Sequence, residues 1–194
     1  MEHYFSKKPT SAKKEILIHY AMGNYSFKFY SSSSVFSKKR IDKGSELLIK
    51  ESVIPSGDVL DIGCGYGAIG IILSKIYPKT TITMTDINER ALELVKRNLK
   101  LNDAKATVIK SNLFQKMDSK FDSILSNPPQ HAGKKVCIKI IEDSKNYLNP
   151  NGTLQLVARH QKGGKSLSKV MEEVFGNMGT LGRKSGYHLY CSRV

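Results

Sequence analysis

The stretch VLDIGCGYG at residues 59–67 decides the fold, because an apolar run leads directly into three alternating glycines. The run from Val59 to Ile62 predicts a buried strand. Glycines after a strand allow a sharp turn and a close approach of the backbone to a ligand, which a Cβ would prevent. The apolar residues from Gly67 onward predict a helix. We therefore expect a strand–turn–helix unit that cradles a nucleotide-like ligand.

The same alternation of short β-branched runs with amphipathic stretches continues along the chain and predicts an α/β fold with a mainly parallel sheet. The glycine-punctuated tail at 178–193 predicts two antiparallel closing strands. Residues 1–57 are expected to form an N-terminal extension packed on a core of residues 58–194, within one structural domain. Further expected strands are 80–85, 106–109, 123–126 and 153–158, and expected helices begin near 88, 133 and 165. In the extension we expect a strand at 25–32 and a helix at 43–52 entered through Asp42.

The composition limits the classes of protein to which this chain can belong. The formal net charge is +14, from 31 Lys and Arg against 17 Asp and Glu, and a field of this size attracts polyanions. No apolar run is long enough for a signal peptide or a membrane span, so a cytoplasmic protein is expected. The three cysteines show no CxxC spacing, which indicates neither disulfides nor a metal site.

The position of the glycines relative to the strand indicates the ligand. Gly65 to Gly70 spells GxGxxG, but this dinucleotide pattern begins three residues after the strand ends. The earlier frame, DxGxGxG, places Asp61 at the strand end, where a carboxylate can face the cationic amino-acid part of S-adenosylmethionine. A pyrophosphate would be repelled there. From this stretch alone a methyl-donor site has only a modest advantage over other nucleotides.

The next two strand ends also carry polar residues. Asp86 closes the second strand, where a carboxylate can accept hydrogen bonds from two ribose hydroxyls, and Asn88 is expected to cap the following helix. After the third strand, Asn112 is placed to bond an adenine amino group while apolar neighbours enclose the ring. These positions favour an adenosine-containing cofactor.

The fourth strand ends in Asn127-Pro128-Pro129-Gln130. The Asn127 side-chain oxygen and the Pro128 carbonyl can both accept hydrogens from a planar NH2 group, and the prolines stiffen the backbone. This arrangement would orient the nitrogen lone pair toward a donor methyl group. No strong base is required, because water can remove the proton from the methylated nitrogen; a single histidine, His131, is more often incidental in such a loop.

The motifs DIGCGYG, TDIN, SNLF and NPPQHAG, in this order and spacing, resemble class I methyltransferases that modify amino nitrogens. Together with Phe36-Ser37 and IDKGSELL at 41–48, they resemble the small-subunit ribosomal RNA guanine-N2 methyltransferases over nearly the whole chain, in particular their catalytic half as a stand-alone archaeal-type protein. The resemblance implies a Rossmann-like fold with a seven-stranded, mainly parallel sheet covered by helices on both faces. It also implies a catalytic loop of Asn127, Pro128 and Pro129, cofactor contacts from Asp61, Gly63, Cys64, Gly65, Asp86, Ile87, Asn112, Leu113 and Asn127, and substrate contacts from Gln130, His131 and Lys134.

The expected function is methyl transfer from S-adenosylmethionine to an exocyclic amine, most specifically guanine N2 of ribosomal RNA, free or in a small-subunit particle. Such enzymes usually carry aspartate at the position of Asn112, and many amino methyltransferases carry an aromatic residue at that of Gln130. The alternatives are adenine N6, a protein glutamine, or a catalytically weak cofactor-binding RNA module. The family's second domain has no counterpart here, and the basic segments at 38–43 and 134–139 are expected to grip RNA in its place.

Overall fold

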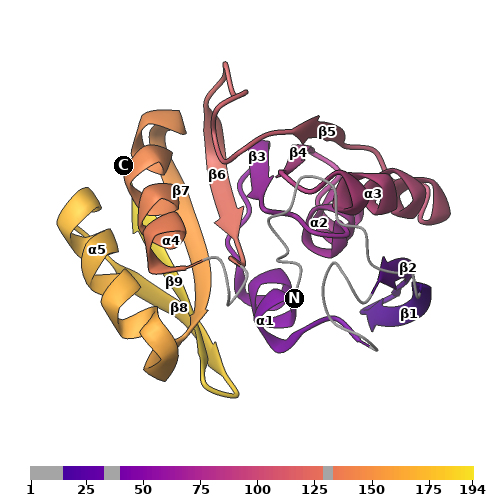
Figure 1. Cartoon of the computed structure of the whole chain (residues 1–194), viewed down its shortest axis with the longest axis horizontal. Helices are drawn as coiled ribbons and strands as arrows, with labels where there is room; N and C mark the ends of the chain where they lie inside the picture. Colours follow the sequence, from indigo (N-terminus) through magenta and orange to yellow (C-terminus); the bar gives the residue numbers. More distant parts are fainter. Residues whose placement is uncertain (1–14, 33–39, 129–132) are drawn as a thin grey trace.

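The structure is a computed structural model that describes residues 15–32, 40–128 and 133–194. A seven-stranded sheet runs through its centre in the order β5-β4-β3-β6-β7-β9-β8 (Figure 1). Strands from β5 to β7 are parallel, whereas β9 is antiparallel to β7 and β8. The strands are β3 (Gly57–Ile62), β4 (Thr80–Asp86), β5 (Thr107–Lys110), β6 (Phe121–Ser126), β7 (Leu148–Arg159), β8 (Gly179–Lys184) and β9 (Tyr187–Arg193). The predicted fold class and the antiparallel edge are confirmed.

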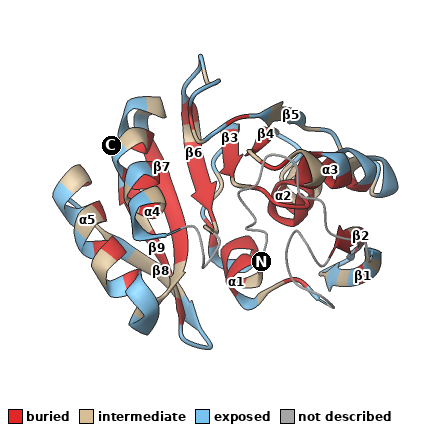
Figure 2. Cartoon of the chain, in the orientation of Figure 1, coloured by how far each residue is buried: buried red, intermediate tan, exposed pale blue. Residues whose placement is uncertain are grey.

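Helices cover both faces of this sheet, which explains why most residues of its central strands are buried (Figure 2). Successive residues of β3 enter different cores: Val59 packs with α1, α2 and α3, whereas Leu60 packs with α4 and α5. In β6, Leu125 and Ile124 divide between the two cores in the same way. The helices are α1 (Lys43–Glu51), α2 (Ala68–Ile76), α3 (Glu89–Leu101), α4 (Lys134–Ser144) and α5 (Lys165–Phe175).

Two helices begin at the capping residues that the sequence predicts. The Asp42 side chain accepts hydrogen bonds from the backbone N–H groups of Gly44 and Ser45, and α1 follows. The Asn88 side chain accepts from Arg90 N, and α3 follows. Each cap satisfies N–H groups that the helix itself leaves without a partner. These caps therefore fix where both helices leave the sheet edge.

The segment before α1 contains a hairpin of β1 (Glu15–Met22) and β2 (Tyr25–Ser32), which forms a sheet of its own. Strand β2 matches the expected strand at 25–32, whereas β1 was not predicted, although its Ile16, Ile18 and Tyr20 alternate toward the core. The hairpin packs on α3 and not on the edge of the main sheet. Two asparagines one helical turn apart, Asn98 in α3 and Asn102 at its C-cap, form hydrogen bonds with the backbone N–H and C=O groups of β2. The backbone of a neighbouring strand would make the same kind of bonds.

Asn98 makes the stronger of these two contacts. Its side-chain oxygen accepts from Tyr30 N at 2.7 Å, and its amide nitrogen donates to the carbonyl oxygens of Tyr30 and Tyr66 at 2.9 Å each. Asn102 makes a similar pair of bonds to Lys28, but at an exposed position. Since Tyr66 lies in the glycine-rich loop, the buried Asn98 ties hairpin, helix and loop together.

We expect Asn98→Ala to lower the free energy of unfolding by about 2 kcal/mol, because buried backbone groups lose their partners. Asn102→Ala is the matched control: it removes the same type of contact where water can replace it, so its effect should stay below about 1 kcal/mol. Urea denaturation of both variants measures the difference. Equal losses would contradict the role assigned to Asn98.

Candidate active site

Four parallel strands bring their carboxyl ends to one edge of the sheet, and each end is followed by polar or glycine residues. Strand β3 ends before Gly63, β4 at Asp86, β5 before Ser111 and β6 before Asn127. Open α/β sheets bind ligands at this edge. The residues predicted from separate stretches of sequence are thus brought to one side of the molecule.

The glycine loop after β3 is held open by hydrogen bonds to β4. Gly63 N and Cys64 N donate to the Thr85 carbonyl oxygen at 2.8 and 2.9 Å, and Gly65 N donates to Asp86 Oδ2 at 2.9 Å. Gly63 has φ +72°, and a Cβ built there would have no atom within 4 Å, so the loop backbone borders open space. Asp86 Oδ1 also accepts from Asn88 N at 2.8 Å. Asp86 therefore shapes the loop in addition to facing the cleft.

Asp61 is a buried carboxylate whose charge is only partly compensated. Its Oδ2 accepts from Gly70 N at 3.0 Å, and Oδ1 has no hydrogen-bond partner among the described residues. Burial raises the pKa of Asp61 to about 7; the Gly70 hydrogen bond lowers this pKa and the negative charge of Asp86 raises it. A cation bound beside Oδ1 would reduce the free-energy cost of burying the charged carboxylate, since an opposite charge favours the ionised form.

A cleft of about 90 Å³ lies beyond the glycine loop. Five residues predicted to contact a cofactor line it: Gly63, Asp86, Ile87, Asn112 and Leu113. Its other lining residues are Ile62, Thr85, Ser111, Ser126, Pro128, Val136 and Ile140.

The remaining predicted cofactor contacts lie beside this cleft. Asp61 sits beneath the loop, and Cys64 is buried with its thiol near the Gly65 carbonyl oxygen, at 3.8 Å. Burial is also the main cause that raises the pKa of Cys64, so this thiol is not a nucleophile at neutral pH. Cys64 and Gly65 thus belong to the wall of the loop and are not among the residues lining the cleft.

The turn after β5 has an unusual backbone conformation that the sequence pattern did not predict. Leu113 adopts φ +51°, in the left-handed region that side chains other than glycine rarely occupy. The Ser111 hydroxyl donates to the Leu113 carbonyl oxygen at 2.8 Å and accepts from Lys116 N at 3.2 Å, which holds the turn. The strained turn keeps Leu113 and Asn112 together on the cleft.

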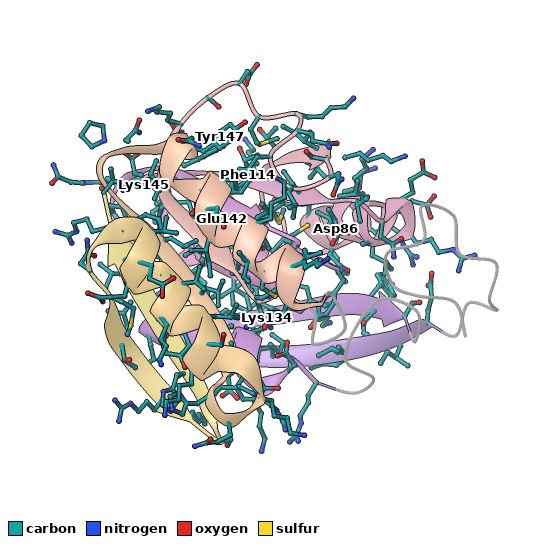
Figure 3. The ribbon with its side chains drawn as sticks, turned by 60° about the vertical axis from the view of Figure 1, so that its left-hand side comes forward. Asp86, Phe114, Lys134, Glu142, Lys145 and Tyr147 are labelled. Atoms are coloured by element: carbon teal, nitrogen blue, oxygen red, sulfur yellow. The ribbon has the colours of Figure 1, made fainter. Side chains whose placement is uncertain are left out.

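A second cleft of about 280 Å³ adjoins the first, and Pro128 lines both. Asn127 and Lys134 were predicted here, whereas Pro129, Gln130 and His131 lie outside the described residues. Figure 3 shows Lys134 at the beginning of α4. The other lining residues are Gly133, Cys137, Val157, Ala158, Arg159, Lys162, Gly163, Leu167 and Tyr187.

Three functional candidates in the second cleft were missed by sequence reasoning. The Arg159 guanidinium lies over the Tyr187 ring, 5.1 Å from its centroid, and its buried Nε has no hydrogen-bond partner among the described residues. Lys162 lies in an irregular turn, η2 (His160–Gly164), that follows β7. They come from β7, η2 and β9, so no local motif marks them as a group.

Asn127 is held from the N-terminal side of the chain. Its side-chain nitrogen donates to Ser45 Oγ at 2.8 Å and to Asp42 Oδ1 at 3.1 Å. Both acceptors belong to the beginning of α1, more than 80 positions away in the sequence. The end of β6 and the beginning of α1 are thereby joined at the second cleft.

The described residues contain no group of three or more His, Cys, Asp or Glu side chains that could hold a metal ion. None of the helices in 15–32, 40–128 and 133–194 is long and apolar enough to cross a membrane.

Comparison with known proteins places the chain among methyltransferases. Residues 26–191 match the family described as the methyltransferase small domain. The uncharacterized protein YbxB of Bacillus subtilis is 40% identical and covers 97% of this chain and 96% of its own length. Ribosomal RNA small subunit methyltransferase C of Hamiltonella defensa is 37% identical over 80% of this chain, but the match covers 47% of that relative.

A solved structure shows the same fold. It is the Thermus thermophilus 16S rRNA N2 G1207 methyltransferase (RsmC) in complex with AdoMet and guanosine, with a TM-score of 0.78 and 22% identity over 96% of this chain and 52% of that one. The chain thus spans about half the length of the ribosomal RNA methyltransferases that it matches. The predicted family and fold are confirmed: the chain belongs to the methyltransferase small domain family and has the class I methyltransferase fold.

Proposed function

We propose that this protein transfers a methyl group from S-adenosylmethionine to the N2 amino group of a guanine in small-subunit ribosomal RNA. The observation that carries the proposal is the junction of two clefts at Pro128, one bordered by the glycine loop and the other by Asn127. The names of the relatives, ribosomal RNA small subunit methyltransferase C and a 16S rRNA N2 methyltransferase, support guanine as the acceptor.

The first cleft fits S-adenosylmethionine. Gly63 leaves room for the ligand, and the partnerless Oδ1 of Asp61 offers an acceptor for the amino group. Both Asp86 oxygens already accept backbone N–H groups, but each keeps a lone pair for a ribose hydroxyl. Ile87 and Leu113 would enclose the adenine ring, and Asn112 would bond its edge. When bound, this cofactor supplies a methyl group on a positively charged sulfur.

The second cleft would hold the acceptor base. Asn127 Oδ1 and the Pro128 carbonyl would accept the two hydrogens of the guanine NH2 and so orient the nitrogen lone pair toward Pro128 and the first cleft. As the new N–C bond forms and the C–S bond breaks, these two dipoles would stabilise the positive charge that develops on nitrogen. The nitrogen then loses a proton to water. Tyr187 and Arg159 present the ring and guanidinium planes on which bases stack.

The basic rim of the second cleft fits an RNA backbone. Lys134 and Lys162 line the cleft, and Lys135 is exposed beside them. Helix α4 begins there at Gly133, and no described side chain caps its first N–H groups, which can bind a phosphate. Gln130 and His131 remain proposed substrate contacts from the sequence. A ribosomal substrate also agrees with the cytoplasmic location expected from the sequence.

We expect the purified protein to transfer label from S-adenosylmethionine to guanine N2 of unmodified small-subunit ribosomal RNA. Asn127→Ala should lower the rate at least about 100-fold, because an acceptor for the amine is lost. Nucleoside digestion identifies the labelled base. Asn149→Ala is the matched control, since Asn149 bonds Asp122 at the opposite end of β6. Label on adenine, or no transfer despite cofactor binding, would contradict the guanine assignment.

Asp61→Asn should stabilise the protein at neutral pH while weakening cofactor binding. The folded-state pKa of Asp61 is raised to about 7 from 3.8, so the protonated group favours folding below about pH 4 and this contribution is lost as pH rises to about 7. Asparagine carries no charge. The stability advantage of the variant should therefore grow by about 3 kcal/mol between about pH 4 and pH 7.5.

Urea denaturation across this pH range measures the stability change, and calorimetric titration with S-adenosylmethionine measures the loss of affinity. Asp58→Asn is a suitable control, because Asp58 is an exposed carboxylate at the other end of the same strand. A stability difference that does not change with pH would contradict the buried, uncompensated state of Asp61.

Lys134→Ala/Lys135→Ala should weaken RNA binding and reduce the slope of log K against log salt concentration by about 1.5–2, because each of the two lost phosphate contacts releases counterions. Lys96→Ala/Lys100→Ala is the charge-matched control, with both lysines exposed on α3. Filter binding at several salt concentrations gives the slopes. If both pairs change the slope equally, RNA does not pass over the beginning of α4.

A further inference from the structure

We propose that Asp42 and Ser45 are positioning residues that fix the orientation of the Asn127 amide, so that its oxygen faces the acceptor amine. The inference rests on the proposed function and extends it to the beginning of α1, outside the strand ends and the Asn-Pro-Pro loop. Its basis is a pair of hydrogen bonds from the Asn127 amide, one of them to a carboxylate oxygen that already accepts from two backbone N–H groups.

The two hydrogens of the Asn127 amide are both used by α1. One bonds Ser45 Oγ at 2.8 Å and the other bonds Asp42 Oδ1 at 3.1 Å. Asp42 Oδ1 already accepts from two backbone N–H groups and so acts as an acceptor, and the nitrogen of Asn127, not its oxygen, must face it. The amide oxygen is thereby kept away from the carboxylate and lies beside Gly44, at the wall of the second cleft.

The reversed orientation would work against methyl transfer. A flipped Asn127 would place its oxygen against the Asp42 carboxylate, with two acceptors facing one another; the Ser45 hydroxyl could still bond it by donating, so Asp42 sets the orientation and Ser45 adds a second anchor. The flipped NH2 would then face the NH2 of the substrate, which supplies no acceptor. Orientation of this amide therefore decides whether the site can bind an amine at all, and a free amide in solution would not select one orientation.

Asp42 Oδ1 combines this contact with the cap of α1. The same oxygen accepts from Gly44 N at 2.9 Å and from Ser45 N at 3.1 Å, so the carboxylate is locked to the helix end before it meets Asn127. The helix in turn is anchored by Leu47, Leu48 and Ile49, which are buried. A rigid element thus holds the orienting groups, which is what a positioning role requires.

Gly44 allows this close approach. A Cβ built on Gly44 would lie 3.1 Å from Asn127 Oδ1 and 3.1 Å from Tyr187 Cε1. The backbone of α1 therefore passes directly beside the catalytic amide and beside an aromatic wall of the second cleft. In this light the motif at 41–48 contributes to the site itself, in addition to starting a helix.

Four variants test the proposal, in the full chain with S-adenosylmethionine and unmodified ribosomal RNA. Ser45→Ala removes one acceptor, and we expect kcat to fall about tenfold while the Kd for S-adenosylmethionine stays within about twofold. Ser45→Thr restores the hydroxyl and should restore most of kcat. Asp42→Ser keeps a capping side chain but is too short to reach Asn127, so kcat should fall at least as far. Glu46→Gln is the control in the same helical turn: it weakens the ion pairs with Lys50 and Lys184 without touching Asn127, and kcat should not change.

A coupling measurement separates positioning from a general effect on folding. Adding Ser45→Ala to Asn127→Ala should cause no further loss of the residual rate, because the amide that Ser45 orients is already absent. Equal fold losses in both backgrounds, or a normal kcat in Ser45→Ala and Asp42→Ser, would overturn the proposal.

The side-chain NH2 resonances of Asn127 provide a readout that does not depend on activity. In nitrogen-15-labelled protein both hydrogens should be shifted and protected from exchange, and Ser45→Ala should abolish this for one of them. If the wild type shows protection but transfers no methyl group to RNA, the proposed function fails while the positioning contact stands. Unprotected NH2 hydrogens in the wild type would overturn the contact itself.

Discussion

The hydrogen bonds between the glycine loop and the end of β4 are the constraint on which the rest of the site depends. Thr85 accepts from two consecutive loop N–H groups, and Asp86 accepts from Gly65. These bonds continue the parallel pairing of β3 with β4 beyond the end of β3, so the loop cannot fold back over the sheet edge. The cleft therefore stays open and α2 starts in a fixed direction. Asp61 is held in a buried position beneath the loop.

Residues that act through local pattern could be predicted from the sequence, and residues that act through tertiary contact could not. The strand ends at Asp61, Asp86 and Asn127 follow from short apolar runs with polar ends, because parallel strands share one edge. Arg159 and Tyr187 meet only because β7 and β9 pair antiparallel, in a register that places these two residues opposite each other. Asp42 is recognisable as a helix cap, but its bond to Asn127 spans 85 positions and leaves no periodic signal.

Two features of the site lower the stability of the folded protein. Asp61 is buried with one oxygen that has no partner among the described residues, and Leu113 occupies a left-handed conformation that residues other than glycine rarely adopt. Such features persist only where the surrounding structure imposes them, and here β4 and the Ser111 hydroxyl do so. The surrounding core compensates: the central strands are buried on both faces by five helices. A strained cleft is thus supported by a rigid scaffold, as functional sites generally require.

The charges of the two clefts differ in a way that matches the proposed ligands. Asp61 and Asp86 give the first cleft a negative character, which suits a cofactor with a cationic sulfur and an ammonium group. Arg159, Lys134 and Lys162 give the second a positive character, which suits a polyanion. The phosphates of the proposed RNA substrate would therefore be repelled from the cofactor side and attracted to the other, and the two fields meet at Pro128. At that junction the orienting groups are neutral dipoles, Asn127 and a carbonyl, because a full charge there would favour one ligand over the other. The direction of the amide dipole then decides whether an amine can bind at this point. For this reason the orientation of the amide is secured by a carboxylate that accepts a hydrogen bond from its nitrogen.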